Sequence, residues 1–331
     1  MTIDVALHQA GFDRIAERLE ALKLPVRLLL LQRDGRYLLN GRQVALAENP
    51  PEAAWLSLDV GVAGQFGSMI DDLLAAGGTR WLQTFNAGLD DPRYVDIARA
   101  GIRVSASSAQ AVAISEYTFA HVLNVYQPIE AQRRLQATKE WKRLPFRELS
   151  RATWVIVGFG NIGREVAKRA KAFGSRVLAV RRRPEPSPLA DEVAGIEALP
   201  RMLSEADVVV LSAPHTRETE RMADAGFFGA LKKGAILVNV ARGGLVDDAA
   251  LLRALDDGTV STAVLDVFEP EPLPTDDPYW SHPKVRLTAH SSFAGEGTIH
   301  RGDDLFLTNL PRYLAGEPLV NEVDVSYLLE G

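Results

Sequence analysis

The stretch that decides the fold reads TWVIVGFGNIG, from Thr153 to Gly163. A mostly apolar, strand-like run leads directly into a glycine-rich turn, and a helical pattern follows. In this strand–turn–helix context the pattern G-x-G-x-x-G is typical of a dinucleotide-binding unit. The first glycine permits the tight turn, the second lets the backbone approach a pyrophosphate, and the third lets the helix pack on the sheet. The helix N-terminus offers N–H groups to the phosphates. We therefore predict cofactor contacts from Gly158, Phe159, Gly160, Asn161, Ile162 and Gly163.

Strand-like and helix-like segments alternate on both sides of this stretch. Toward the N-terminus, strands are predicted at Arg27–Leu31, Ala54–Leu58 and Trp81–Phe85, and helices at Ser68–Ala76 and Arg93–Ala100. Residues 108–139 carry almost no Gly or Pro except Pro128 and predict one or two helices. Further strands are predicted at Arg176–Val180, Asp207–Ser212, Ala235–Val240, Val260–Leu265 and Val285–Ala289, and a helix in the tail after Gly295. Such alternation predicts an α/β fold with parallel sheets.

Length and composition narrow the class of protein. The 331 residues suit two domains, and the formal net charge of −6 argues against nucleic acid or an anionic membrane as the main partner. The absence of cysteine excludes disulfides, thiolate metal sites and a cysteine nucleophile, and we predict no metal site. We see neither a secretory signal nor an apolar run long enough to span a membrane. We expect a soluble, cytoplasmic protein.

The end of the second strand of this unit carries a basic triplet, Arg181-Arg182-Arg183. NAD-binding units usually place an acid about 20 residues after the glycine loop, where it accepts a hydrogen bond from the ribose 2′-hydroxyl. Guanidinium groups instead bind a 2′-phosphate through charge-assisted hydrogen bonds. We predict that Arg181 and Arg182 contact this phosphate, so that NADP(H) is preferred and NAD(H) remains possible. Arg183 precedes Pro184, which biases it toward an extended conformation.

Three charged side chains follow later strands. Arg242 comes after the strand Ala235–Val240, Glu271 follows Val260–Leu265, and His290 ends Val285–Ala289. Open α/β sheets bind ligands outside the carboxyl ends of their strands, so this spacing could bring the three together. A guanidinium, a carboxylate and an imidazole would form an anion anchor with an acid/base pair, which indicates an enzyme.

Four segments together resemble the D-isomer-specific 2-hydroxyacid dehydrogenases, a family that includes glyoxylate/hydroxypyruvate reductases and phosphoglycerate dehydrogenase. They are the glycine loop, NVARGGLVD at Asn239–Asp247, LDVFEPEPL at Leu265–Leu273, and LTAH at Leu287–His290. Their order and spacing match over residues 80–325. Asn86-Ala87-Gly88-Leu89-Asp90 is similar to the substrate loop of the family. Many members carry an acid where Arg181 stands, and this departure resembles the NADP-using reductases.

The resemblance assigns roles to individual residues. Arg242 would bind the substrate carboxylate and 2-oxo group, His290 would exchange the proton, and Glu271, rather than the adjacent Glu269, would pair with His290. Asp266 resembles the residue that contacts the nicotinamide carboxamide, although a turn cap is the alternative. The further positions implied in the cofactor site are Pro214, Val240 and Ala241, and those implied in the substrate site are Asn86, Ala87 and Gly88.

The resemblance also implies a discontinuous architecture. Residues 1–107 and 294–331 would form the substrate domain, and residues 108–293 would form an inserted dinucleotide-binding Rossmann domain. The fold class is then α/β, with two Rossmann-like or flavodoxin-like parallel-sheet domains. A homodimer built around the helices of residues 108–139 is implied as well, with a small 2-oxo acid or D-2-hydroxy acid as substrate.

Three functions remain open on the sequence. The leading one is reduction of a small 2-oxo acid to a D-2-hydroxy acid with NADPH or NADH. A second is oxidation of D-3-phosphoglycerate, which we consider less favoured because the two domains occupy the whole chain and leave no room for regulatory domains. A third is a dinucleotide-sensing interaction protein, similar to the corepressors related to this family. The 2-oxo acid itself is not identified by these residues.

Overall fold

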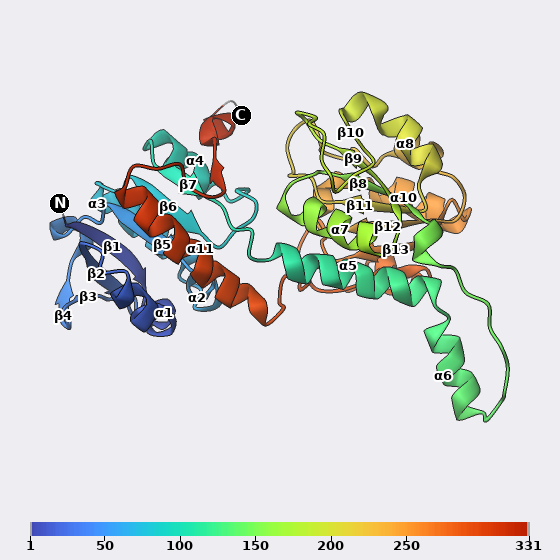
Figure 1. The fold of residues 1–331 in the computed structure, drawn as a ribbon, viewed down its shortest axis with the longest axis horizontal. Coiled ribbons are helices and arrows are strands. Elements are labelled where there is room, and N and C mark those ends of the chain that lie inside the picture. Colours follow the sequence, from blue (N-terminus) through green and yellow to red (C-terminus); the bar gives the residue numbers. More distant parts are fainter. Residues whose placement is uncertain (1, 330–331) are drawn as a thin grey trace. The chain divides into compact units, whose positions relative to one another are not determined.

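The computed structural model describes residues 2–329 and divides into two compact units. Unit 1 comprises the chain up to Gln110 and the chain from Glu296 onward, whereas unit 2 is the continuous segment Ala111–Gly295. Unit 1 is therefore built from both ends of the sequence, with unit 2 inserted between them (Figure 1).

Unit 1 is an eight-stranded sheet covered by helices on both faces, and the strand order is β15-β7-β6-β5-β1-β2-β3-β4. The elements from the N-terminal part are β1 (Ile3–His8), α1 (Gln9–Ala21), β2 (Val26–Leu31), β3 (Tyr37–Leu39), β4 (Arg42–Val44), β5 (Ala53–Leu56), α2 (Leu58–Val62), α3 (Phe66–Ala76), β6 (Trp81–Thr84), α4 (Arg93–Arg99) and β7 (Arg103–Ser105). The C-terminal part adds α11 (Gly297–Leu314) and β15 (Glu322–Val323).

The two faces of the unit 1 sheet are filled by alternating residues of the same strands. In β1, Val5 and Leu7 pack on the side of α1 and α11, whereas Ala6 packs on the side of α3 and α4. The C-terminal helix α11 contributes Phe306, which stacks on the ring of Trp55 at a centroid distance of 4.4 Å. The period of two in each strand thus builds a core on both sides of the sheet.

The unit 1 sheet is mainly parallel, as expected from the sequence, with antiparallel strands only at its two edges. Its five central strands run parallel, but β3 and β4 form an antiparallel hairpin at one edge, and β15 pairs antiparallel with β7 at the other. Strand β1 was not predicted from sequence, because Asp4 and His8 interrupt its apolar run. Strand β5 ends at Leu56, earlier than expected, since Ser57 is the N-cap of the short helix α2.

Unit 2 is a doubly wound sheet of seven strands, all parallel, in the order β10-β9-β8-β11-β12-β13-β14. Its strands are β8 (Thr153–Val157), β9 (Arg176–Val180), β10 (Glu192–Ala194), β11 (Val208–Leu211), β12 (Ala235–Asn239), β13 (Val260–Leu265) and β14 (Val285–Leu287). Its helices are α5 (Ala111–Tyr126), α6 (Ile129–Ala137), α7 (Asn161–Ala172), α8 (Leu199–Glu205), α9 (Ala225–Gly229) and α10 (Asp248–Asp256). This order reverses direction between β8 and β11, which is the ligand-binding switch point of such sheets.

Buried side chains alternate across β8 in the same way. Trp154 and Ile156 pack on α5 and α7, whereas Val155 and Val157 face α8, α9 and α10. The predicted helical segment of residues 108–139 is two helices, and it breaks at Pro128, the N-cap of α6. Helix α6 has no buried residue and projects away from the rest of unit 2 (Figure 1).

No helix between residues 2 and 329 combines the length and apolar character needed to cross a membrane. The same residues contain no group of three or more His, Asp or Glu side chains that could hold a metal ion.

Candidate active site

The centre of the site is a hydrogen-bonded pair of an imidazole and a carboxylate in unit 2. His290 Nδ1 lies 2.8 Å from Glu271 Oε2. A carboxylate only accepts hydrogen bonds, so Nδ1 carries a proton, and Nε2 is the ring nitrogen left to exchange a proton with a ligand. The second oxygen, Oε1, accepts from the backbone N–H of Phe268 at 2.9 Å. Both side chains stay accessible, with exposed fractions of 42% for His290 and 36% for Glu271.

The loop that carries His290, residues 288–292, is organised around one buried carboxylate. Asp266 is fully buried at the end of β13. Its Oδ1 accepts from the Ser291 N–H at 2.8 Å and from Thr288 Oγ1 at 2.6 Å, and its Oδ2 accepts from the Ser292 N–H at 3.0 Å. We call residues 288–292 the histidine loop. Strand β14 ends at Leu287, so His290 does not end a strand as expected but lies in this loop.

A second buried polar residue organises the loop that carries Arg242, residues 240–243, which we call the arginine loop. Asn239, 1% exposed, ends β12. Its Oδ1 accepts from the Ala241 N–H at 3.1 Å, and its Nδ2 donates to the Arg242 carbonyl at 2.9 Å. Arg242 Nη1 donates to the Ala241 carbonyl at 2.6 Å. The amide of Asn239 therefore fixes the backbone that carries the guanidinium.

The arginine loop packs directly against the segment that carries Glu271. A Cβ atom added to Gly243 would lie 2.1 Å from the Phe268 carbonyl carbon, so only glycine fits there. A Cβ on Gly244 would meet the Glu269 carboxylate at 2.6 Å and the His215 ring at 2.7 Å. The structure thus brings Glu271 to His290 and places Glu269 beside Gly244.

The glycine loop, Gly158–Gly163, has the shape that a pyrophosphate requires. Gly158 has φ +99°, and a Cβ there would lie 2.3 Å from the Ala213 backbone nitrogen. A Cβ on Gly163 would lie 2.2 Å from the Gly158 carbonyl oxygen, which shows how closely α7 approaches the turn. A Cβ on Gly160 would meet nothing within 4 Å among the described residues, and the N-cap position of α7 makes no side-chain capping bond. A helix N-terminus of this kind fits a dinucleotide phosphate.

Around this loop the other predicted cofactor residues lie at strand ends. Pro214 is exposed after β11, whereas Val240 and Ala241 are buried, 5% and 6% exposed, after β12. Ser212 Oγ donates to the Gly158 carbonyl at 2.7 Å and ties the end of β11 to the glycine loop.

The basic triplet follows β9. The side chain of Arg181 is 28% exposed and lies 3.7 Å from Glu185, whose own exposed fraction is 73%. Arg182 and Arg183 are exposed. The Glu185 carboxylate would therefore compete with a 2′-phosphate for Arg181. This competition was not expected from the sequence.

The predicted substrate loop, Asn86-Ala87-Gly88, lies in unit 1 after β6. Asn86 Nδ2 donates to the Tyr94 hydroxyl at 2.9 Å, and that hydroxyl is 2.6 Å from Thr84 Oγ1. Burial raises the pKa of Tyr94 to about 12, so its hydroxyl remains protonated. This buried network fixes the start of the loop.

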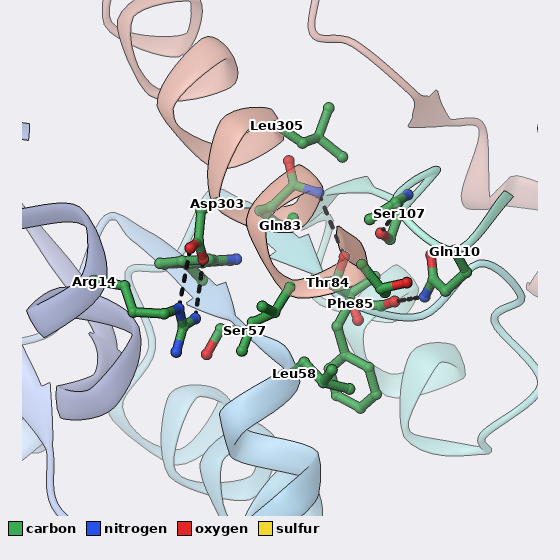
Figure 2. A pocket seen from close by; sticks show the side chains of 15 residues that line it. Arg14, Ser57, Leu58, Gln83, Thr84, Phe85, Ser107, Gln110, Asp303 and Leu305 are labelled. Carbon is green, nitrogen blue, oxygen red and sulfur yellow. Dashed lines mark hydrogen bonds and ion pairs between the residues drawn. The ribbon is translucent and has the colours of Figure 1, made fainter. Parts of the chain in front are cut away.

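Beside this loop, unit 1 contains a small cavity of about 20 Å³ (Figure 2). Such a volume holds roughly one water molecule rather than a substrate. On one side of it Arg14 forms bidentate ion pairs with Asp59 and Asp303, at 2.7–3.0 Å, which join α1, α2 and α11. This network was not predicted from sequence, because its members are far apart in the chain.

Asn239 and Thr288 were likewise not predicted as organising residues. The available signal for Asn239 was a polar amide inside the apolar run Ala235–Val240. Thr288 offered no such signal, because threonine is ordinary in a strand.

Unit 2 has an all-parallel, doubly wound sheet with a glycine loop at its switch point, and an arginine and an imidazole–carboxylate pair on loops that follow later strands of the same sheet. This combination defines a dinucleotide-dependent oxidoreductase. Residues 119–292 match the family described as D-isomer specific 2-hydroxyacid dehydrogenase, NAD binding domain. The chain belongs to this family, and unit 2 is its nicotinamide dinucleotide-binding part.

Two relatives and one solved structure agree with this assignment. The chain is 32% identical over 212 residues to glyoxylate/hydroxypyruvate reductase A of Serratia proteamaculans, covering 64% of this chain and 67% of that protein. It is 36% identical over 211 residues to D-3-phosphoglycerate dehydrogenase of Bacillus subtilis, but the match covers 61% of this chain and only 39% of that protein. A solved D-isomer specific 2-hydroxyacid dehydrogenase of Xanthobacter autotrophicus, in complex with NADPH and MES, has a TM-score of 0.77 at 26% identity, covering 99% of this chain and 100% of that one.

Proposed function

We propose that this protein reduces a small 2-oxo acid to the corresponding D-2-hydroxy acid with a nicotinamide cofactor. The observation that carries the proposal is the 2.8 Å bond between His290 Nδ1 and Glu271 Oε2, because the segment that carries Glu271 packs against the arginine loop. The sequence similarity to a glyoxylate/hydroxypyruvate reductase supports this substrate class.

In the proposed reaction His290 is the acid. When bound, a reduced nicotinamide would supply a hydride to C2 of the substrate. His290 would give the proton on Nε2 to the oxygen on which negative charge then develops. Glu271 holds Nδ1 and stabilises the positive charge that the ring carries before it gives up this proton. In the oxidative direction the same nitrogen accepts the proton of the 2-hydroxyl group.

Arg242 is proposed to bind the substrate carboxylate. A guanidinium matches a carboxylate through two parallel hydrogen bonds and also stabilises negative charge that develops on the carbonyl oxygen. Asn239 fixes the backbone of Arg242, so the side chain starts from a defined position. A side chain that is already held in place loses less conformational entropy when the substrate binds.

The central test removes the acid and its partner separately. His290→Ala should lower kcat by about 10²–10⁴-fold, the usual contribution of a general acid, and leave the Kd for the cofactor unchanged. Glu271→Gln should give a smaller loss, because its amide oxygen can still accept from Nδ1 without supplying charge. Retention of more than half of kcat in His290→Ala, with chemistry rate-limiting, would show that another group donates the proton.

The anion anchor is tested in the same assay. Arg242→Ala should raise KM for the oxo acid and lower kcat, because the guanidinium would act in both the ground state and the transition state. Arg242→Lys should restore activity only partly, since an ammonium group cannot form the bidentate pair. Equal kinetics in these variants and the wild type would place the carboxylate elsewhere.

We propose in addition that NADPH is preferred over NADH through Arg181 and Arg182. Arg181 lies 3.7 Å from Glu185, so the 2′-phosphate would have to replace this carboxylate as its partner. Arg181→Asp should reverse or abolish the preference measured as kcat/KM for the two cofactors. Glu185→Gln should sharpen it, because the competing charge is lost. Better use of NADH by the wild type would contradict the proposal.

Two alternatives are tested by a substrate panel. The similarity to a D-3-phosphoglycerate dehydrogenase favours a phosphorylated substrate as the second candidate. Steady-state turnover of glyoxylate, hydroxypyruvate and D-3-phosphoglycerate with each cofactor separates the two enzymes. Tight cofactor binding with no turnover on any 2-oxo or 2-hydroxy acid would favour a dinucleotide-sensing interaction protein.

We also propose that the protein is a cytoplasmic homodimer built around the helices of residues 108–139, together with the segment that follows them. Helix α6 has no buried residue, and in the segment after it Trp141 is 100% exposed and Phe146 is 55% exposed. Such apolar side chains on a projecting segment are typical of an interface. Light scattering should give twice the chain mass, and Trp141→Ser should shift it toward the monomer. Cell fractionation tests the compartment.

A further inference from the structure

A chain of hydrogen bonds runs from helix α5 to the histidine loop. The Tyr117 hydroxyl, on α5, lies 2.7 Å from Thr288 Oγ1, and Thr288 Oγ1 donates to Asp266 Oδ1 at 2.6 Å. Asp266 then accepts from the backbone N–H groups of Ser291 and Ser292. The chain thus joins a helix to the loop of His290, although Tyr117 and Thr288 are separated by 171 positions in the sequence.

The direction of each bond follows from the number of protons available. Thr288 has one hydroxyl proton, which it gives to the carboxylate of Asp266. Its oxygen can therefore only accept from Tyr117, so Tyr117 must donate. Burial raises the pKa of Tyr117 to about 12, which keeps that proton in place over the working range of the protein. The two hydroxyl hydrogen bonds therefore have a fixed direction: Tyr117 donates to Thr288, and Thr288 donates to Asp266.

The far end of the chain sets the backbone of His290 itself. The His290 N–H donates to the Asp266 carbonyl at 2.8 Å, and His290 adopts φ +47°. A positive φ is uncommon for a residue other than glycine, and such a residue keeps this conformation only where several surrounding contacts hold it. Asp266 supplies this constraint through its carbonyl and both carboxylate oxygens. A shift of Asp266 would therefore move the imidazole.

We propose that Tyr117 and Thr288 are positioning residues for His290 and act on it through Asp266. This inference rests on the proposed role of His290 as the acid. The two residues would not touch the substrate. They would hold the Asp266 carboxylate, and through it the histidine loop, in the position in which Nε2 faces the reacting oxygen.

The helix offers a matched control for this proposal. Tyr126 also lies on α5 and is 4% exposed, but its hydroxyl has no hydrogen-bond partner among the described residues. Tyr117→Phe and Tyr126→Phe therefore remove the same atom from the same helix, and only the first change breaks the chain. A general effect of losing a phenolic hydroxyl from α5 would be similar in both variants.

The experiment measures kcat, KM and cofactor Kd in Tyr117→Phe, Tyr126→Phe, Thr288→Val and Thr288→Ser. We expect Tyr117→Phe to lower kcat by about 2- to 10-fold, and Thr288→Val, which removes a bond to a charged group, by about 10- to 100-fold. Thr288→Ser should restore most of the turnover, and Tyr126→Phe should match the wild type. Cofactor Kd should change much less than kcat, since the glycine loop is unchanged.

A spectroscopic readout separates positioning from a loss of stability. With ¹⁵N-labelled histidine, the imidazole signals of His290, assigned by their loss in His290→Gln, should shift in Tyr117→Phe and remain in place in Tyr126→Phe. Wild-type kcat and unshifted His290 signals in Tyr117→Phe would overturn the inference, whether or not Thr288→Val folds. Activity retained by His290→Gln would instead overturn the proposed function, so the two failures are distinct.

Discussion

The two halves of the candidate site in unit 2 are shaped by opposite means. The glycine loop depends on residues without a side chain, because a Cβ on Gly158 would lie 2.3 Å from the Ala213 nitrogen. The histidine and arginine loops owe their form to polar atoms that are present, the side chains of Asp266 and Asn239. The glycine loop must let a dinucleotide phosphate approach its backbone closely. The other two loops must hold the side chains of His290 and Arg242 in defined positions.

This difference predicts how each half fails. A loop defined by glycine is damaged by adding a single carbon, because the backbone has no room to move. A loop defined by buried hydrogen bonds is damaged by removing a single polar group, because its partners are left unsatisfied. Additions should therefore break the glycine loop, and deletions should break the other two.

The largest effect is expected from Gly158→Ala. The added carbon would overlap the backbone at Ala213, and alanine would have to adopt φ +99°. Together these should destabilise unit 2 by about 3 kcal/mol or more. Calorimetry should show a lower Tm for Gly158→Ala, together with loss of cofactor binding.

Gly160→Ala is the informative partner of that variant. Its Cβ would meet nothing within 4 Å among the described residues, so the Tm should be unchanged while the cofactor Kd rises. Gly229→Ala, equally unhindered but at the end of α9, should change neither quantity. A normal Tm in Gly158→Ala would refute the view that exclusion of side chains defines this loop.

A smaller effect is expected at Gly243, which is a closely packed glycine within the hydrogen-bonded arginine loop. Gly243→Ala would push the arginine loop away from Phe268, whose carbonyl carbon would lie 2.1 Å from the new Cβ. We expect a cost of about 1–3 kcal/mol in stability, the usual range for overpacking, and a lower kcat/KM for the oxo acid. The cofactor Kd should change less than kcat/KM. An unaffected kcat/KM would show that the arginine loop need not contact the Phe268 segment.

Deleting a polar group should give the next effect. Asn239→Ala would leave the Ala241 N–H and the Arg242 carbonyl without the amide that binds them, which costs about 1–3 kcal/mol. We expect kcat/KM to fall by about 10-fold or more, chiefly through KM, as Arg242 loses its support. Asn309→Ala removes an equally buried amide from unit 1 and controls for stability alone. Equal kinetics in these two variants would contradict a role for Asn239 in holding Arg242.

The smallest effect concerns the opposite edge of the same sheet, where Asp207 precedes β11. Burial alone would raise the pKa of Asp207, but the Thr153 N–H and the cations of Lys232 and Arg147, at 2.8–2.9 Å, hold it below its usual value. The carboxylate therefore stabilises the fold above its unfolded pKa of about 3.9, and this contribution disappears as the pH falls through the lower folded pKa. Asp207→Asn should lower the Tm at pH 7, and this difference should shrink as the pH falls below the unfolded pKa of about 3.9. A difference that does not shrink with falling pH would exclude this charge as the cause.

The sequence was informative at positions where the local backbone geometry permits only one type of residue. Three glycines at fixed spacing after a strand predicted the glycine loop, and the apolar runs predicted the strands of unit 2 closely, except for the short edge strand β10, which was not predicted. The antiparallel edges of unit 1 escaped prediction, because β3, β4 and β15 are only two or three residues long and their pairing depends on distant partners. The hydrogen bonds that join Tyr117 and Thr288 to Asp266 also escaped prediction, because their partners lie far apart in the chain. Asp266 itself was singled out from sequence, with a turn cap as one of its two possible roles.

The discontinuity of unit 1 has a consequence for how the chain folds during synthesis on a ribosome. Unit 2 is one uninterrupted segment and can fold once Gly295 has emerged. Unit 1 cannot, because Phe306 and Asp303 from α11 complete its core and its ion-pair network, and β15 closes the edge beside β7. Domains fold as units during translation, so the N-terminal part of unit 1 would wait, with the apolar face that receives α11 uncovered, until α11 and β15 have been translated. The N-terminal segment is therefore the part of the nascent protein that most needs protection by chaperones.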